Sequence, residues 1–221
     1  MNTEPKPFSV IMTVYDQAHE LEQQLPLFLT QEYEPGYEVI VVDESSTDDT
    51  PSILKMLKKE YNHLYTTFLP KPNAQTFRQR LAFNIGIKAS HNEYIIITKI
   101  TIPPRDTDVF KAVSEVLDPN ATLTLGYVTQ KNIRLQPFNT VVEAEGYIRR
   151  AERRISKVRE RKRGNYIWGR YNFIILQKDC AIELLKLFEQ DINAFELFRI
   201  RLRILWKNLL GRSSTTLLVT T

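Results

Sequence analysis

The stretch Y-E-V-I-V-V-D-E-S-S-T-D-D-T, residues 37–50, decides the fold of this chain. Its four consecutive apolar residues, 39–42, predict a strand buried on both faces. The run ends at Asp43, a polar turn follows, and Thr50 and Pro51 predict a helix N-cap and first helical position. A carboxylate at the carboxyl end of a buried parallel strand lies where open α/β sheets bind ligands. Asp43 is therefore a candidate ligand contact, and the alternative is that it caps its own turn.

Strand and helix patterns alternate through the first hundred residues. Besides the central strand, short apolar runs predict strands at residues 8–14, 64–69 and 93–97. The first helix is expected to bury Leu21, Leu25, Phe28 and Leu29, with a kink or a late start at Pro26. The helix after Pro51 is expected to bury Ile53, Leu54, Leu57 and Tyr61, and the helix at 76–89 to bury Phe77, Leu81 and Ile85. This alternation predicts an α/β fold with a doubly wound, mainly parallel sheet and helices on both faces.

Beyond residue 104 the patterns predict a helix at 109–117 and a strand at 123–129 with Gly126 at a bend. A long helix is predicted at 141–163, a return to the sheet within 166–176, and a short helix at 182–188.

Composition predicts one large domain in a reducing compartment. The 221 residues are 43% hydrophobic, which is enough for a sizeable core. The lone Cys180 excludes an intramolecular disulfide. The first residues do not resemble a signal peptide, and no apolar run reaches the ~20 residues of a membrane-spanning helix. A cytoplasmic location is expected.

The net charge of +4 is unevenly distributed. Residues 149–163 hold nine Lys or Arg against two Glu, and 195–212 hold five against one, so the rest of the chain is net negative, at −7. Three interpretations of the run at 149–163 remain open: a solvated helix face, a surface for anionic lipid or a phosphate-bearing lipid-linked acceptor, or a nucleic-acid site. Nucleic acid is disfavoured because no aromatic residues are interleaved with the charges.

Residues 195–212 have the pattern of a helix at a membrane interface. At 100° per residue one face is apolar and carries Trp206, while Arg199, Arg203 and Lys207 share another. This predicts peripheral attachment to the inner face of a membrane. A core helix docked on the sheet and a strand are the alternatives.

Three segments together resemble the family 2 glycosyltransferases of the GT-A fold. S-V-I-M-T-V-Y-D, residues 9–16, resembles the family's first strand and its end. V-I-V-V-D-E-S-S-T-D-D-T, residues 39–50, resembles its second strand and acidic turn. A-F-N-I-G-I-K-A-S-H-N-E-Y-I, residues 82–95, resembles the helix and strand that lead into the metal site. The resemblance covers roughly residues 8–118.

The resemblance implies that a nucleotide-diphosphate sugar, with a UDP-sugar favoured, binds over the strand ends. Thr13, Val14, Tyr15 and Asp16 would contact the base, and Asp43 would accept a hydrogen bond from it, with Ser45 beside it. Arg78 would reach the base or the phosphates. The alternatives are ordinary strand-end packing for Tyr15 and a solvated helix face for Arg78.

The sequence departs from the family immediately after the fourth strand. The family has an Asp-x-Asp-type motif there that holds Mn²⁺ or Mg²⁺, and this chain has Lys99, Ile100 and Thr101. Hard divalent ions need oxygen ligands that Lys and Ile lack, so no cofactor and no metal ligand are predicted. The alternative is that Asp106 or Asp108 folds back to hold Mn²⁺ or Mg²⁺. Lys99 has three interpretations: its ammonium neutralises the leaving diphosphate as a catalytic group, the site has decayed, or it pairs with Asp43 or Glu44.

The implied activity is that of a glycosyltransferase of the hexosyltransferase type, acting on a saccharide or lipid-linked acceptor. An inverting transfer needs a general base, and Glu143 and Glu145 are the candidates, although both also suit surface partners of the following basic run. The alternative function is a catalytically silent relative that binds a nucleotide sugar or a partner transferase. The expected organisation is a glycosyltransferase-like domain at 1–190, with a nucleotide-binding half at 8–104 and an acceptor-side half at 105–190, followed by a basic amphipathic segment at 191–221.

Overall fold

The computed structural model describes residues 5–69, 78–121, 123–128, 133–139, 173–179 and 181. Several predictions from the sequence lie outside this part of the chain. They are the helices at 141–163 and 182–188, the amphipathic segment at 195–212, the thiol of Cys180 and the domain boundary at 190.

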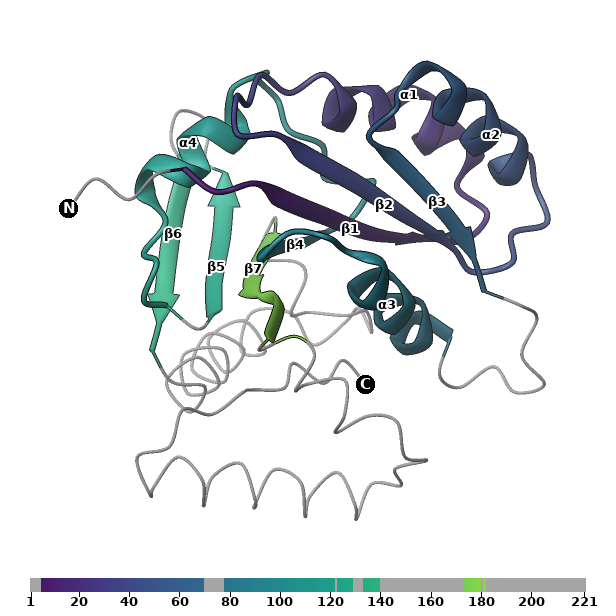
Figure 1. The fold of residues 1–221 in the computed structure, drawn as a ribbon. Helices are drawn as coiled ribbons and strands as arrows, with labels where there is room; N and C mark the ends of the chain where they lie inside the picture. The colour runs from purple at the N-terminus through teal and green to yellow at the C-terminus, as the bar shows by residue number, and fades with distance from the viewer. Residues whose placement is uncertain are drawn as a thin grey trace, which may run out of the picture.

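The described residues form seven strands and four helices (Figure 1). The strands are β1 (Phe8–Val14), β2 (Tyr37–Asp43), β3 (Leu64–Phe68), β4 (Tyr94–Thr98), β5 (Leu123–Val128), β6 (Ile133–Phe138) and β7 (Phe173–Gln177). The helices are α1 (Ala18–Leu29), α2 (Thr50–Glu60), α3 (Arg78–Ala89) and α4 (Val109–Val116). The predicted alternation of strand and helix through the first hundred residues is confirmed.

One mixed sheet joins all seven strands in the order β3-β2-β1-β4-β7-β5-β6. The neighbours β3, β2, β1 and β4 run parallel to one another, as predicted. β7 is antiparallel to β4, and β5 pairs antiparallel with both β7 and β6. The expectation of a mainly parallel sheet was therefore too broad, because parallel pairing among the described strands is confined to β1, β2, β3 and β4, whose connections contain α1, α2 and α3.

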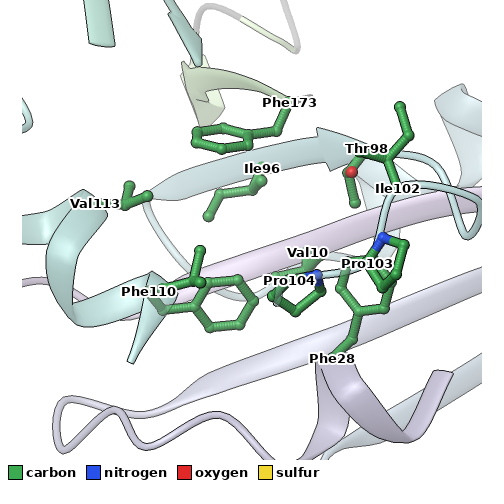
Figure 2. A pocket seen from close by; sticks show the side chains of 11 residues that line it. Val10, Phe28, Ile96, Thr98, Ile102, Pro103, Pro104, Phe110, Val113 and Phe173 are labelled. Carbon is green, nitrogen blue, oxygen red and sulfur yellow. The ribbon is translucent and has the colours of Figure 1, made fainter. Parts of the chain in front are cut away.

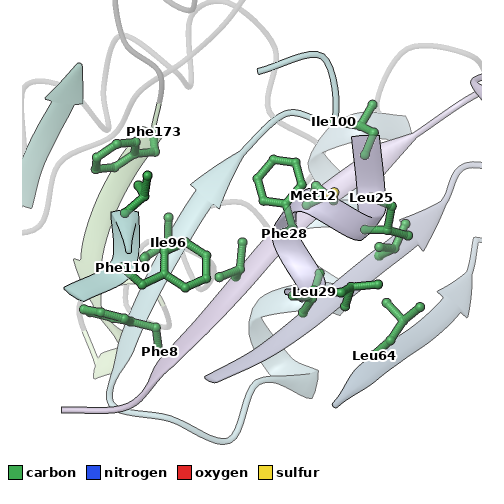
Figure 3. Packing of buried hydrophobic residues seen from close by; sticks show 14 of the residues in the cluster. Phe8, Met12, Leu25, Phe28, Leu29, Leu64, Ile96, Ile100, Phe110 and Phe173 are labelled. Atoms are coloured by element: carbon green, nitrogen blue, oxygen red, sulfur yellow. The ribbon is translucent and has the colours of Figure 1, made fainter. Parts of the chain in front are cut away.

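Alternate residues of the central strands pack against the two helical layers. On one face, Val10 and Met12 of β1 and Val39 and Val41 of β2 join the core beneath α1 and α4 (Figure 3). On the other face, Ile11 of β1 and Val42 of β2 pack toward α3. Figure 1 shows α1 and α2 on one side of the sheet and α3 on the other. Burial on both faces explains why these strands are continuous apolar runs.

The predicted faces of α1 and α2 are confirmed. The buried residues of α1 are Leu21, Leu25, Phe28 and Leu29, and those of α2 include Leu54 and Leu57. Pro26 lies inside α1, which already begins at Ala18, so the helix does not start late. The N-cap of α2 is Asp49 and not the predicted Thr50.

The predicted face of α3 was partly wrong. Leu81 is 45% exposed, Ile85 is half-buried and packs against the core, and Phe77 lies outside the described residues. Ala82, Gly86 and Ile87 are buried. A Cβ on Gly86 would lie 2.5 Å from Ile11 Cγ2, so the missing side chain lets α3 approach β1 closely. The close approach to β1 is therefore made by a small residue, while Ile87 also packs in the core and Leu81 lies away from it.

On the far side of the sheet, β5, β7 and α4 match the predictions, with β7 falling inside the interval 166–176 except for its last residue. Gly126 lies within β5 and not at a bend, and a Cβ there would overlap the ring of Phe173 in β7. β6 was not predicted, because I-R-L-Q-P-F contains Arg134 and Pro137. Pro137 is tolerated because β6 is the edge strand of the sheet.

Candidate functional site

The carboxyl ends of the parallel strands form one edge of the sheet, and several predicted site residues lie there. β1 ends at Val14 and β2 at Asp43, and these residues are register partners. Asp43 is in turn the partner of Phe68, the last residue of β3. β4 ends close by at Thr98. The structure therefore brings Asp43 beside Tyr15, which follows Val14, at the edge where open α/β sheets bind ligands.

The Asp43 carboxylate is only 5% exposed and is held by its own turn. Its Oδ1 accepts hydrogen bonds from the Ser46 N–H at 2.9 Å and the Ser46 hydroxyl at 2.6 Å. Oδ2 has no hydrogen-bond partner within the described ranges. Asp43 thus caps its turn through one oxygen, and the other oxygen remains as an acceptor at the strand end.

Asp16 and Ser45 join the neighbouring loops. Both have left-handed backbones, with φ of 48° and 64°, which is strained for residues other than glycine. Asp16 Oδ1 accepts the Thr47 N–H at 2.7 Å, and the Asp16 N–H donates to Ser46 Oγ at 2.9 Å. The Ser45 hydroxyl donates to the carbonyl of Leu69. These bonds position the loops, and contact of Asp16 or Ser45 with a donor stays a prediction.

The rest of the acidic turn binds the start of α1. The Ala18 N–H donates to Asp48 Oδ2 at 3.0 Å, and the Gln17 N–H donates to Thr50 Oγ1 at 3.2 Å. Slight burial alone would raise the pKa of the Asp48 carboxyl, but the hydrogen bonds from Ala18 and Thr50 outweigh it and lower that pKa. The polar residues after Asp43 are therefore explained by contacts between two loops, and they fix the position of the strand ends.

Two exposed aromatic residues lie at the ends of the strands that flank β2, Tyr15 just after β1 and Phe68 at the end of β3. Tyr15 is 44% exposed and Phe68 is 70% exposed. Apolar aromatic surface is costly to leave in water, and aromatic faces at a ligand site stack on nucleobases. The sequence analysis did not identify Phe68. The sequence could have indicated it, because Phe68 lies near the end of the predicted strand at 64–69. The end of a strand parallel to β2 lies at the same edge of the sheet as Asp43.

Thr13 and Val14 have different surroundings. Thr13 is half-buried, whereas Val14 is 1% exposed and its carbonyl accepts the Glu44 N–H at 2.8 Å. A contact between Val14 and a base would therefore involve the backbone, as the resemblance implies, and its carbonyl is already engaged by Glu44.

Lys99 is the first residue after β4 and begins a tight turn, in which the Ile102 N–H donates to its carbonyl at 3.0 Å. Ile97 of β4 is the partner of Ile11, so continuing the register by two places sets Lys99 level with Thr13. Burial lowers the pKa of the half-buried Lys99 ammonium. The described hydrogen bonds to the Asp43 carboxylate come from Ser46, and pairing of Lys99 with Asp43 or Glu44 stays a prediction.

The residues after β4 do not fit a hard divalent cation. Ile100 is 1% exposed and packs in the core near Met12 and Leu25 (Figure 3). Among the described residues, no group of three or more His, Cys, Asp or Glu side chains could hold a metal ion.

Asp106, the next carboxylate along the chain, is held at the opposite edge of the sheet. Its carbonyl accepts the Gln31 side-chain amide at 2.9 Å, and the carbonyl of Thr107 accepts the Glu32 N–H at 2.6 Å. Gln31 and Glu32 follow the end of α1, a helix of 12 residues, or about 18 Å. Since α1 starts at the edge where β1 ends, Asp106 is roughly one helix length from Lys99 and does not supply a ligand there.

The turn after β4 covers an apolar cavity of about 30 Å³ (Figure 2). Side chains from β1, α1, β4, α4 and β7 meet there, among them Phe28 of α1, Thr98 of β4 and Phe110 of α4. Its lining is apolar apart from Thr98 and contains no charged side chain, so it lacks the groups that would hold the charged part of a nucleotide sugar.

Three candidate residues have no described side chain. Arg78 is the first residue of α3, and only its backbone is described. Glu143 and Glu145 lie outside the described residues altogether. Their roles stay predictions.

The comparison with protein families matches residues 9–98 to the family described as glycosyl transferase family 2. That interval runs from β1 to the end of β4 and contains the four parallel strands.

The chain is similar to one curated protein, the dolichyl N-acetyl-alpha-D-glucosaminyl phosphate 3-beta-D-2,3-diacetamido-2,3-dideoxy-beta-D-glucuronosyltransferase of Methanococcus voltae. The two are 29% identical over 94 residues, which are 40% of this chain and 27% of the relative. The chain thus spans about a quarter of the length of that relative.

Among solved structures, the chain is similar to the mannosyltransferase PcManGT from Pyrobaculum calidifontis in complex with GDP-Man and Mn²⁺. The TM-score is 0.55 at 21% identity, over 82% of this chain and 47% of that one. A weaker likeness is to S. aureus TarS in complex with UDP, with a TM-score of 0.44 at 20% identity over 53% of this chain and 34% of that one. The likeness to PcManGT shows a shared fold. Residues 9–98 are therefore similar to glycosyl transferase family 2, and the seven-stranded α/β sheet that contains them shares its fold with PcManGT.

Proposed function

We propose that this protein is a glycosyltransferase that takes a sugar from a nucleotide-diphosphate-sugar donor. The observation that carries the proposal is the strand-end edge that brings together buried Asp43 of β2 and the exposed aromatic residues Tyr15, after β1, and Phe68, at the end of β3. The match of residues 9–98 to glycosyl transferase family 2 supports it.

The base of the donor is the part that this edge can recognise. A uracil or guanine ring has an N–H on its pairing edge, and Asp43 Oδ2 is an acceptor without a partner in the described chain. A hydrogen bond to a buried, ionised acceptor is stronger than one between neutral groups. The aromatic rings supply stacking surface at the same edge. Both UDP- and GDP-sugars satisfy this chemistry, and the mannosyltransferase of similar fold is in complex with GDP-Man.

The acceptor is proposed to be a saccharide or a lipid-linked sugar. The name of the M. voltae relative contains a dolichyl phosphate sugar, which is a lipid-linked group. Such an acceptor would place the protein at the cytoplasmic face of a membrane, where the basic residues at 149–163 and 195–212 suit anionic head groups. No helix among the described residues is long and apolar enough to cross a bilayer. Co-sedimentation with anionic and neutral vesicles tests this attachment.

A catalytically silent relative is the second candidate. The observation that favours it is the replacement of carboxylates by Lys99, Ile100 and Thr101 after β4. Such a protein would bind a nucleotide sugar, or a partner transferase, at the same edge and transfer nothing.

Calorimetry with UDP and GDP and with their sugars, combined with an assay for sugar release or transfer, separates the candidates. Binding with turnover supports the enzyme, and binding without turnover supports the silent relative. The matched variants are Asp43→Asn, which keeps one oxygen for the turn but removes the free acceptor, and Ser46→Ala, which weakens only the turn. We expect Asp43→Asn to weaken nucleotide binding about 10- to 100-fold, as the loss of a hydrogen bond to a charged group should. Equal affinities for wild type and Asp43→Asn would contradict the proposed role of this carboxylate.

A further inference from the structure

We propose that Asp48 is a positioning residue for nucleotide binding, which acts by holding the loop that carries Tyr15 against the loop that follows Asp43. The inference rests on the proposed function and names a further residue on which binding at this edge depends. It is carried by the hydrogen bonds that run between the two loops.

One carboxylate serves the first turns of two helices. The Ala18 N–H, at the start of α1, donates to Asp48 Oδ2 at 3.0 Å. The Thr50 N–H, at the start of α2, donates to Asp48 Oδ1 at 3.0 Å. The N-cap residues of these helices, Gln17 and Asp49, make no side-chain capping hydrogen bond. The first N–H groups of a helix have no acceptor within the helix, so Asp48 supplies acceptors that neither N-cap provides.

The bond from Asp48 to α1 belongs to a row of three. The consecutive N–H groups of residues 16, 17 and 18 donate to Ser46 Oγ, Thr50 Oγ1 and Asp48 Oδ2, at 2.9, 3.2 and 3.0 Å. The row begins directly after Tyr15, and its three acceptors follow β2 in the chain. The backbone next to Tyr15 is therefore held by the loop after β2.

The backbone of Asp16 makes this loop dependent on its partners. Its φ of 48° is a left-handed conformation that residues other than glycine adopt at a cost and that surrounding contacts must maintain. Tyr15, just before it, is 44% exposed, whereas Asp43 is 5% exposed within β2. Burial thus fixes Tyr15 less firmly than Asp43. Loss of the Asp48 carboxylate should therefore shift the loop that carries Tyr15 while Asp43 stays in place.

The charge and exposure of Asp48 suit this role. Burial alone would slightly raise the pKa of its carboxyl, but the hydrogen bonds from Ala18 and Thr50 lower that pKa, so the ionised form holds both helices. A negative charge is also favoured at the N-terminus of a helix. Because Asp48 is exposed, its removal leaves no cavity in the core. We therefore expect a small effect on stability and a larger effect on the ligand.

The test measures binding of UDP and GDP to the full chain by calorimetry, with thermal unfolding of each variant to show that it folds. Asp48→Ala removes both bonds, and Asp48→Asn keeps one acceptor oxygen. Asp118→Ala is the matched control, because Asp118 Oδ1 accepts the Asn120 N–H at 2.9 Å in a turn after α4. That turn lies at the other edge, since the Pro119 carbonyl accepts the amide of Gln177, opposite the first residue of β4.

A double-mutant cycle with Tyr15→Ala separates positioning from a general loss of stability. Asp48→Ala should weaken binding about 5- to 10-fold in the wild-type background and less than about 2-fold in Tyr15→Ala, because residues that act through one another are not additive. Asp48→Asn should have an intermediate effect, and Asp118→Ala should leave the affinity unchanged. If Asp48→Ala does not fold, the same cycle is measured with Asp48→Asn.

Two results would overturn the inference while leaving the proposed function in place. They are an unchanged affinity in the folded Asp48 variants, or a loss of the same size with and without the Tyr15 ring. Absence of UDP and GDP binding by wild type would instead refute the proposed function, and the inference with it.

Discussion

The buried carboxylate of Glu38 joins three elements at the edge of the sheet opposite the candidate site, and its removal should strongly destabilise the fold. Glu38 Oε1 accepts the Ser9 hydroxyl at 2.5 Å and the His91 N–H at 2.6 Å, and Oε2 lies 2.8 Å from His91 Nδ1. The Glu38 side chain is 7% exposed and Ser9 is fully buried. Glu38→Ala removes all three contacts and leaves the Ser9 and His91 donors without this acceptor.

The size of the effect follows from these contacts. Hydrogen bonds to a charged group contribute about 1.5–3 kcal/mol each, so losing the two short ones should lower the free energy of unfolding by about 3–5 kcal/mol. Glu38→Gln should cost less, about 1 kcal/mol, because one oxygen can still accept both donors and the amide can face His91 Nδ1. The matched control is Glu93→Gln, two residues after His91. This change weakens an exposed ion pair between Glu93 and Lys6, whose atoms lie 2.9 Å apart. That pair should contribute under about 1 kcal/mol.

Urea denaturation followed by circular dichroism measures all three variants. An effect of Glu38→Ala no larger than that of Glu93→Gln would refute the reasoning, because it would mean that the buried network contributes no more than an exposed ion pair. A large but equal loss in Glu38→Gln and Glu38→Ala would show that charge, rather than the number of acceptors, is what stabilises this edge.

Three further predictions concern α3 and the candidate site. Gly86→Ala should lower the free energy of unfolding by about 1–2 kcal/mol in urea titrations, because the new Cβ would lie 2.5 Å from Ile11 Cγ2. The higher helix propensity of alanine offsets part of this loss. Unchanged stability would mean that α3 can move away from β1. Phe68→Ala should weaken UDP binding about 5-fold or more in calorimetry, since one base stack contributes ~1–3 kcal/mol. Thermal stability should change little, because Phe68 is 70% exposed. Equal UDP affinity of the variant and the wild type would contradict a role of Phe68 in the site. Lys99→Met should stabilise the fold near neutral pH, because burial depresses the pKa of the folded-state ammonium below its ordinary 10.5 and so makes the charged form unfavourable. That gain should disappear as the pH rises above 10.5, where the ammonium is neutral in both states, and a gain independent of pH would contradict the electrostatic cause.

The sequence predicted the parallel half of the fold well because burial there leaves long apolar runs. The run at 39–42 indicated β2, and the spacing of Leu21, Leu25 and Phe28 indicated the buried face of α1. The same method failed where small residues make the contact. In α3 the close approach depends on the missing side chain of Gly86, which a pattern of large apolar residues does not show.

The candidate site was predicted only in part. Parallel strand ends must share an edge, so the neighbourhood of Tyr15 and Asp43 followed from the strand pattern alone. The sequence could not show that Ser46 engages one oxygen of Asp43, since turn capping and ligand contact require the same residue type. Nor could it place Asp106, because that depends on the hydrogen bonds that hold residues 106 and 107 to the end of α1.

The reversed direction of β7 determines where the chain returns to the sheet. β7 starts at Phe173, directly opposite Thr98, so the polypeptide re-enters immediately beside Lys99. β6, in contrast, finishes at Phe138, the partner of the first residue of β5, at the other edge. The interval between β6 and β7 therefore begins at the edge of the sheet opposite the candidate site and ends beside Lys99. We expect exchanges within that interval to change the surroundings of the candidate site while the seven-stranded sheet is retained.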